Sequence, residues 1–93
     1  MISTPHNSIS VRKFKRKNQW VAGNPIGIKY FEQAGYHTIR LYDIQSVLFY
    51  WDNLNIIFKW CDENFGHEDW LFKFDYWILT HHKDAFAFKL VWC

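Results

Sequence analysis

Aromatic side chains are the feature that most restricts how this chain can fold. Nine Phe, six Trp and five Tyr make up 20 of its 93 residues. A domain of this size hides only about two-thirds of the surface of its unfolded chain, so its core has limited room. Fourteen rings lie between Phe49 and Trp92, more than one sheet face and one short helix can easily cover. The sequence therefore predicts either a small barrel filled with rings or an aromatic surface on which a partner docks.

The length fits one domain, which we expect over residues 9–93 after a flexible polar tail at 1–8. The longest uncharged apolar run, Ser46 to Trp51, is far shorter than the roughly 20 residues that span a bilayer. The first residues have neither the basic nor the apolar region of a secretory signal, and two cysteines are too few for a disulfide framework. We therefore expect a cytoplasmic protein with reduced thiols and no membrane partner.

The best helix signal lies at residues 25–34. Asn24 can cap the helix, Pro25 suits its first position, and Gly35 suits a left-handed stop after its end. Ahead of this segment, residues 9–17 begin with a weak strand-like alternation. The sequence predicts one short helix here.

Residues 43–61 fit either a helix or a hairpin. Apolar residues from Ile44 to Phe58 follow a helical period, but a helix would then be apolar on all sides. Asp52 and Asn53 interrupt the run where a hairpin would turn, and most of its residues are β-branched or aromatic. The balance favours two strands, at 46–51 and 55–61.

The last thirty residues alternate between apolar and polar, which is typical of a strand pair joined by a connection centred on His82. This register places Asp75 opposite Lys89. It also sets three apolar pairs on the other face: Phe74 with Leu90, Tyr76 with Phe88, and Ile78 with Phe86. Together these patterns predict an α+β fold, an antiparallel β-meander of four or five strands with one short helix near residues 25–34.

Charge is divided unevenly along the chain. Residues 1–42 hold seven basic residues against Glu32 alone, whereas residues 43–93 hold four lysines against eight carboxylates. Five of the six residues from 12 to 17 are basic. Three interpretations explain this basic segment: an arm that contacts phosphates, an edge strand protected by lysines, or a segment that pairs with the acidic half of the chain. The residues that would form a nucleic-acid site are Arg12, Lys13, Lys15, Arg16, Lys17 and Trp20.

No catalytic or metal-binding motif stands out. Adjacent His81 and His82 would point to opposite sides of a strand, and Cys61 lacks any usual zinc spacing with the histidines. The acidic stretch 62–69 lacks the ligand pattern of a calcium loop. We therefore expect no catalytic residues, no metal and no cofactor. A small nuclease-like toxin remains an alternative if His37, His67 or His81 meets a carboxylate in a cleft.

The leading functional hypothesis is a small non-enzymatic protein-binding module. Stand-alone inhibitors and accessory factors of phage or bacteria have this size. Such a module would use an aromatic sheet face or edge to bind another protein, or a second copy of itself as a homodimer. The expected contact residues are Tyr50, Trp60, Phe65 and Trp77. The alternative is a nucleic-acid-binding module that uses the basic segment 12–17.

Overall fold

The computed structural model describes residues 9–21, 23–41 and 47–93, without the side-chain surroundings of residues 21 and 47–50. The predicted tail at 1–8 lies outside these residues. In chain order the elements are α1 (Val11–Lys17), β1 (Trp20–Val21), β2 (Asn24–Pro25), α2 (Ile28–Gln33), β3 (His37–Ile39), α3 (Val47–Asn64), the 3₁₀ turn η3 (His67–Asp69), β4 (Trp70–Lys73), β5 (Tyr76–Leu79) and α4 (His82–Trp92).

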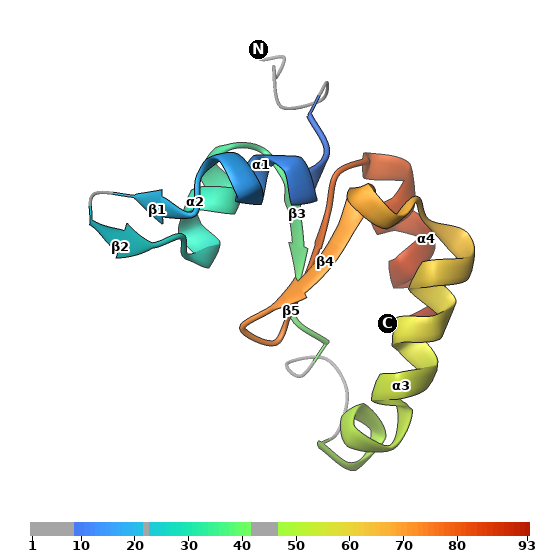
Figure 1. The fold of residues 1–93 in the computed structure, drawn as a ribbon. Coiled ribbons are helices and arrows are strands. Elements are labelled where there is room, and N and C mark those ends of the chain that lie inside the picture. The colour runs from blue at the N-terminus through green and yellow to red at the C-terminus, as the bar shows by residue number, and fades with distance from the viewer. Residues whose placement is uncertain (1–8, 22, 42–46) are drawn as a thin grey trace.

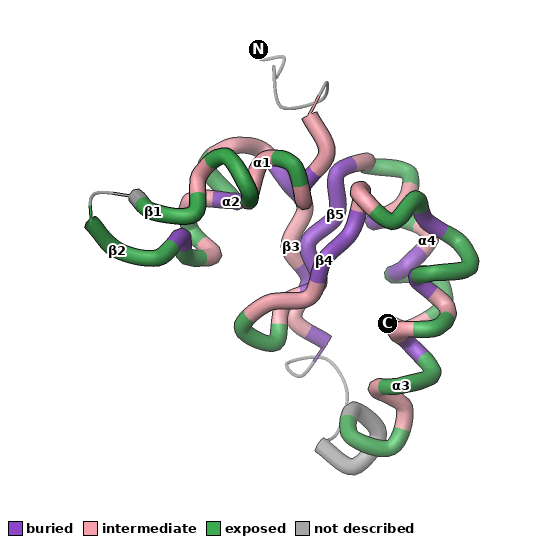
Figure 2. Tube along the Cα trace, in the orientation of Figure 1, coloured by how far each residue is buried: buried purple, intermediate pink, exposed green. Residues whose placement is uncertain are grey.

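A three-stranded antiparallel sheet in the order β3-β5-β4 lies at the centre, between two helical layers. Helices α1 and α2 lie on one side of the sheet, and α3 and α4 lie on the other (Figure 1). The strands are the most continuously buried part of the chain, whereas the separate β1–β2 hairpin is exposed (Figure 2). The fold is therefore mixed helix and sheet, as expected, and both faces of the sheet are covered.

Two clusters of buried side chains form the core. On the α3 and α4 side, Trp77 packs with the helix residues Ile57, Cys61 and Phe88, all fully buried. On the α1 and α2 side, Ile78 packs with the second set: Val11, Ile26, Phe31, Tyr36 and Leu71. The adjacent β5 residues Trp77 and Ile78 thus pack into different clusters, because side chains alternate between the two faces of a strand. Rings fill both clusters, so a layered core holds much of the aromatic excess.

The predicted meander of four or five strands is not confirmed, and its C-terminal register is wrong. Residues 82–92 form helix α4, so the expected pairing of Phe74 with Leu90, Tyr76 with Phe88, Ile78 with Phe86 and Asp75 with Lys89 does not occur. The chain instead turns at Phe74 and Asp75, which places Phe72 opposite Trp77. Strand β5 pairs with β3 on one edge and with β4 on the other. The segment that follows β5 in the chain therefore cannot pair with β5 as a further strand.

The strands expected at 46–51 and 55–61 are also wrong, since residues 47–64 form α3. The helical alternative holds because buried or partly buried residues recur every three or four positions, at Leu54, Ile57, Cys61 and Phe65. Tertiary packing on the sheet overrides the strand preference of β-branched and aromatic residues. Residues 43–46 lie outside the described residues.

Near the N-terminus, residues 11–17 form helix α1 rather than a strand, and Ser10 caps it by accepting a hydrogen bond from the amide of Lys13. The short helix expected at 25–34 is confirmed as α2 at 28–33. Its start is wrong, because Asn24 and Pro25 belong to β2 and Gly27 is the cap. Gly35 follows with φ +94°, the left-handed conformation expected of it.

Candidate functional site

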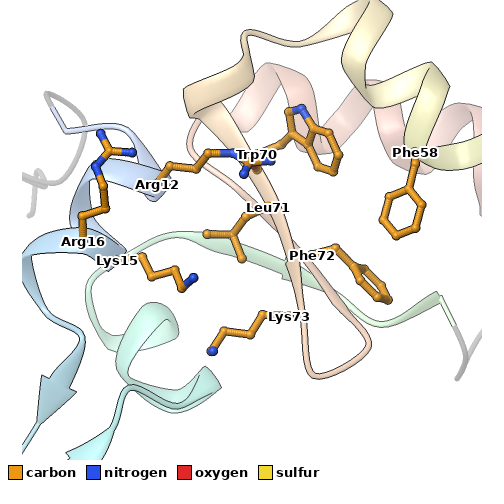
Figure 3. A pocket seen from close by; sticks show the side chains of 8 residues that line it. All are labelled: Arg12, Lys15, Arg16, Phe58, Trp70, Leu71, Phe72 and Lys73. Atoms are coloured by element: carbon orange, nitrogen blue, oxygen red, sulfur yellow. The ribbon is translucent and has the colours of Figure 1, made fainter.

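A hollow of about 430 Å³ runs along the outer edge of β4, between α1 and α3. This volume lies within the range of about 300–1,000 Å³ usual for ligand-binding sites. Figure 3 shows basic side chains from α1 on one side and aromatic side chains from α3 and β4 on the other. Eight residues line it: Arg12, Lys15, Arg16, Phe58, Trp70, Leu71, Phe72 and Lys73. Four of them are cationic, and none of these described lining residues is acidic.

Long-range hydrogen bonds hold α1 at this edge. The amide of Val11 donates to the hydroxyl Oγ1 of Thr80 at 2.8 Å, in a buried position. One residue before the cap Ser10, the carbonyl of Ile9 accepts a hydrogen bond from the hydroxyl of Tyr36 at 2.8 Å. The first bond ties the start of α1 to the residue after β5, and the second ties the segment before α1 to Tyr36, the residue before β3, so the basic side chains of α1 have a defined place beside β4.

Arg12 covers one end of the exposed strand edge. Its Nε donates to the carbonyl oxygen of Trp70 at 2.7 Å, and its guanidinium carbon lies 5.0 Å from the centroid of that indole. Lys73 and Tyr76 flank the two-residue turn, so they form a hydrogen-bonded pair. The alternation of an antiparallel ladder then directs the backbone groups of Trp70 and Phe72 outward. Arg12 donates a hydrogen bond to one of these groups, the carbonyl oxygen of Trp70. The backbone N–H and C=O of Phe72 face the hollow.

Arg16 is engaged by an acidic side chain outside the lining. Both guanidinium Nη atoms donate to the carboxylate of Glu68 in η3. The hydrogen bond from Arg16 holds the pKa of Glu68 below its ordinary value, and the same bond raises the pKa of Arg16. Both side chains are about half exposed, at 57% and 46%, so solvent screens the pair and its contribution to folding stability is small.

Two lysines meet between the helix and the strand. Lys15 from α1 and Lys73 from β4 extend into the same space (Figure 3). They also line a second hollow of about 270 Å³, together with Gln19, Trp20, Pro25 and Ile26. Trp20 is 69% exposed on the β1–β2 hairpin. The hairpin is anchored by buried Ile26, whose amide donates to the carbonyl of Gln19 at 3.0 Å.

The aromatic wall of the first hollow is the outer part of the core. The rings of Phe58 and Phe72 are edge-to-face with centroids 5.2 Å apart, and Phe72 lies 4.6 Å from Trp77. Phe58 and Phe72 are only partly buried, so they present ring surface to the hollow while the core holds them in place. Neither was identified from the sequence.

The structure separates the residues expected to bind a protein partner. Trp77 is fully buried and Phe65 is 7% exposed, so neither side chain offers a surface to a partner. Trp60 is partly buried and packs edge-to-face on Phe65, Phe88 and Trp92. The side chain of Tyr50 lies outside the described residues. The three described side chains, those of Trp60, Phe65 and Trp77, do not form one exposed patch.

The residues expected to bind nucleic acid lie closer together. Arg12, Lys15 and Arg16 line the first hollow, and Trp20 lines the second. Lys13 and Lys17 are exposed on α1 but line neither hollow. Lys73 could not be identified from the sequence, because its proximity to α1 depends on how the helix packs on the sheet.

His81 lies close to a carboxylate, away from these hollows. His81 Nε2 lies 3.4 Å from Asp69 Oδ2, and neither residue lines either hollow. Burial raises the pKa of nearby Asp84, and the positive charge of His81 offsets part of this increase. The rings of His37 and His82 lie 5.5 Å apart, and exposed His67 belongs to η3. Among the described residues, no group of three or more His, Cys, Asp or Glu side chains is arranged to hold a metal ion.

No protein-family model matches this chain, and comparisons with curated proteins and with solved structures likewise find no match. Within the described ranges, none of the helices combines the length and apolar character needed to cross a membrane.

Proposed function

We propose that this protein is a non-enzymatic nucleic-acid-binding module and that the hollow along β4 is its binding site. One observation carries the proposal: four cationic side chains and two partly buried phenylalanine rings line one hollow. Cations with adjacent rings are the combination that binds a phosphate backbone and stacks on its bases.

The four cations have different roles in this proposal. Arg12 is held by Trp70, so it supplies a fixed positive charge at one end of the hollow. Arg16 forms an ion pair with Glu68, which offsets part of its positive charge. Lys15 and Lys73 extend into the hollow and are the main phosphate contacts. Phe58 and Phe72 offer ring surface to a base.

The test is the salt dependence of binding to a fluorescent oligonucleotide. Each phosphate contact that is removed lowers the log–log slope of affinity against salt by about 0.7–0.9. We expect Lys15→Ala and Lys73→Ala each to weaken binding and to lower this slope. Lys59→Ala and Lys83→Ala are matched controls, because these exposed lysines lie on α3 and α4. Equal effects at all four positions would show that binding is only a response to net charge.

The same samples test whether the protein cleaves nucleic acid. We expect the oligonucleotide to remain intact after long incubation with the protein. Cleavage that is lost in His81→Ala would instead support the nuclease alternative, through the contact between His81 and Asp69.

A second candidate function, protein binding, is supported by exposed apolar side chains on the outer helices. In the part of α3 and α4 whose side chains the structure describes, five large apolar residues are at least half exposed: Trp51, Ile56, Phe86, Leu90 and Val91. Phe86 and Leu90 are one helical turn apart and so share a face of α4. This candidate keeps the idea of a protein partner or a homodimer but moves the contact from the sheet to the helices. Light scattering of the Phe86→Ser, Leu90→Ser variant against the unaltered protein tests for self-association.

A further inference from the structure

The two hollows adjoin at Lys15 and Lys73, which line both of them, and together we call them the track. A ligand long enough to occupy both hollows would therefore pass these two ammonium groups. Aromatic side chains line each hollow, with Phe58 and Phe72 in the first and Trp20 in the second. From one hollow to the next, such a ligand would meet rings, then the two lysines, then a further ring.

Lys73 is held at the junction by its own neighbour. Its Nζ lies 4.6 Å from the centroid of the Phe74 ring, a distance at which a cation is attracted to the ring face. Phe74 is 58% exposed at the tip of the β4–β5 turn. The ring therefore keeps the ammonium group near the mouth of the track without neutralising its charge.

This order matches the repeating unit of a single strand. In a single strand the phosphate lies between two bases whose faces are open to stacking. In a duplex the bases are stacked on one another inside, so their faces cannot reach Trp20, Phe58 or Phe72. The phosphate contacts alone would bind both forms, but the rings favour the single-stranded form.

We propose, on the basis of the function above, that the ligand is single-stranded nucleic acid. At least two consecutive nucleotides span the track. One base stacks at Phe58 and Phe72, the linking phosphate lies between Lys15 and Lys73, and the next base stacks on Trp20. Trp20 is thus a binding residue of the second hollow.

The experiment compares a single-stranded oligothymidylate with a duplex of equal length, titrated at one low salt concentration. We expect the single strand to bind about tenfold or more tightly than the duplex. Trp20→Ala should weaken single-strand binding by about tenfold and leave the salt slope unchanged, because the ring contacts a base and not a phosphate. Trp20→Phe keeps a ring and should restore most of the affinity.

Trp51→Ala is the matched control, because Trp51 is 61% exposed on α3 and lines neither hollow. Circular dichroism of each variant confirms that the fold is retained. Equal affinity for strand and duplex, with no effect of Trp20→Ala, would overturn the inference and leave nucleic-acid binding intact. If neither form binds while poly-glutamate does, the occupant is an acidic protein and both proposals are wrong.

Discussion

The amide nitrogen of Val11 lies 2.8 Å from the hydroxyl oxygen of Thr80, 69 positions later in the chain. The bond joins the first residue of α1 to the residue that follows β5. Both residues are buried, so water cannot replace it. This bond places the basic helix beside the sheet, and the hollow along β4 depends on that placement.

Thr80→Val should therefore destabilise the protein and weaken ligand binding together. The amide of Val11 would remain buried without its acceptor, which costs about 1–3 kcal/mol. Thr80→Ser is the control, since it keeps the hydroxyl and loses only a methyl group. Urea unfolding of the three proteins gives the stabilities, and a valine variant as stable as the unaltered protein would show that the bond does not hold α1.

Glu68→Gln should strengthen nucleic-acid binding. Glu68 holds the guanidinium of Arg16 and places a negative charge close to the hollow. Removing that charge frees Arg16 for phosphate, and we expect about two- to threefold tighter binding at low salt. Glu63→Gln, an exposed position on α3, controls for the change in net charge. An unchanged affinity in Glu68→Gln would exclude Arg16 as a phosphate contact.

Phe74→Asn should make the protein more stable. Phe74 has φ +55° and Asp75 has φ +65°, so both lie in the left-handed region that bulky side chains avoid at a cost of about 1–2 kcal/mol. Asparagine tolerates this conformation and is favoured in two-residue hairpin turns. The loss of the contact with Lys73 offsets part of the gain, so we expect about 0.5–1 kcal/mol. Thermal unfolding measures it, and a lower melting temperature would contradict the assignment of strain to Phe74.

Stability should fall as the pH rises through the alkaline range. Burial raises the pKa of Tyr36 from 10.0 to about 12, and burial with the nearby Asp62 raises the pKa of Cys61 from 9.0 to about 12. Above its unfolded pKa, each group ionises more readily in the unfolded chain, so stability is lost between about pH 9 and pH 12. Urea midpoints across this range measure the effect.

Tyr36→Phe isolates the share of this loss that belongs to the phenol. The variant loses the hydrogen bond to Ile9, so its stability near neutral pH should be lower than that of the unaltered protein. Its further decline between about pH 10 and pH 12 should be shallower. An equally steep decline in both proteins would contradict the role of Tyr36.

The sequence identified features that depend on local chemistry. Gly35 marks the end of a helix because it tolerates a left-handed backbone, and α2 ends where expected. The basic segment and Trp20 were recognised from composition alone, and four of those six residues line the hollows.

Features that depend on packing were not predictable. Phe86, Phe88, Leu90 and Trp92 alternate as a strand would, yet in α4 Phe88 enters the core and Leu90 faces solvent. The β4–β5 turn has no glycine or asparagine, so its residues did not indicate a hairpin turn at this point in the sequence. Lys73, Phe58 and Phe72 join the site only because α1 and α3 lie on either side of β4.

The most direct measurement is a nuclear magnetic resonance titration of the labelled protein with a single-stranded oligonucleotide. We predict that the largest shifts fall on the backbone amides of Lys15, Phe72 and Lys73 and on the indole of Trp20, with little change at Phe86 and Leu90. Shifts confined to the exposed face of α4, or no shifts at low salt, would contradict the assignment of the β4 hollow as the binding site.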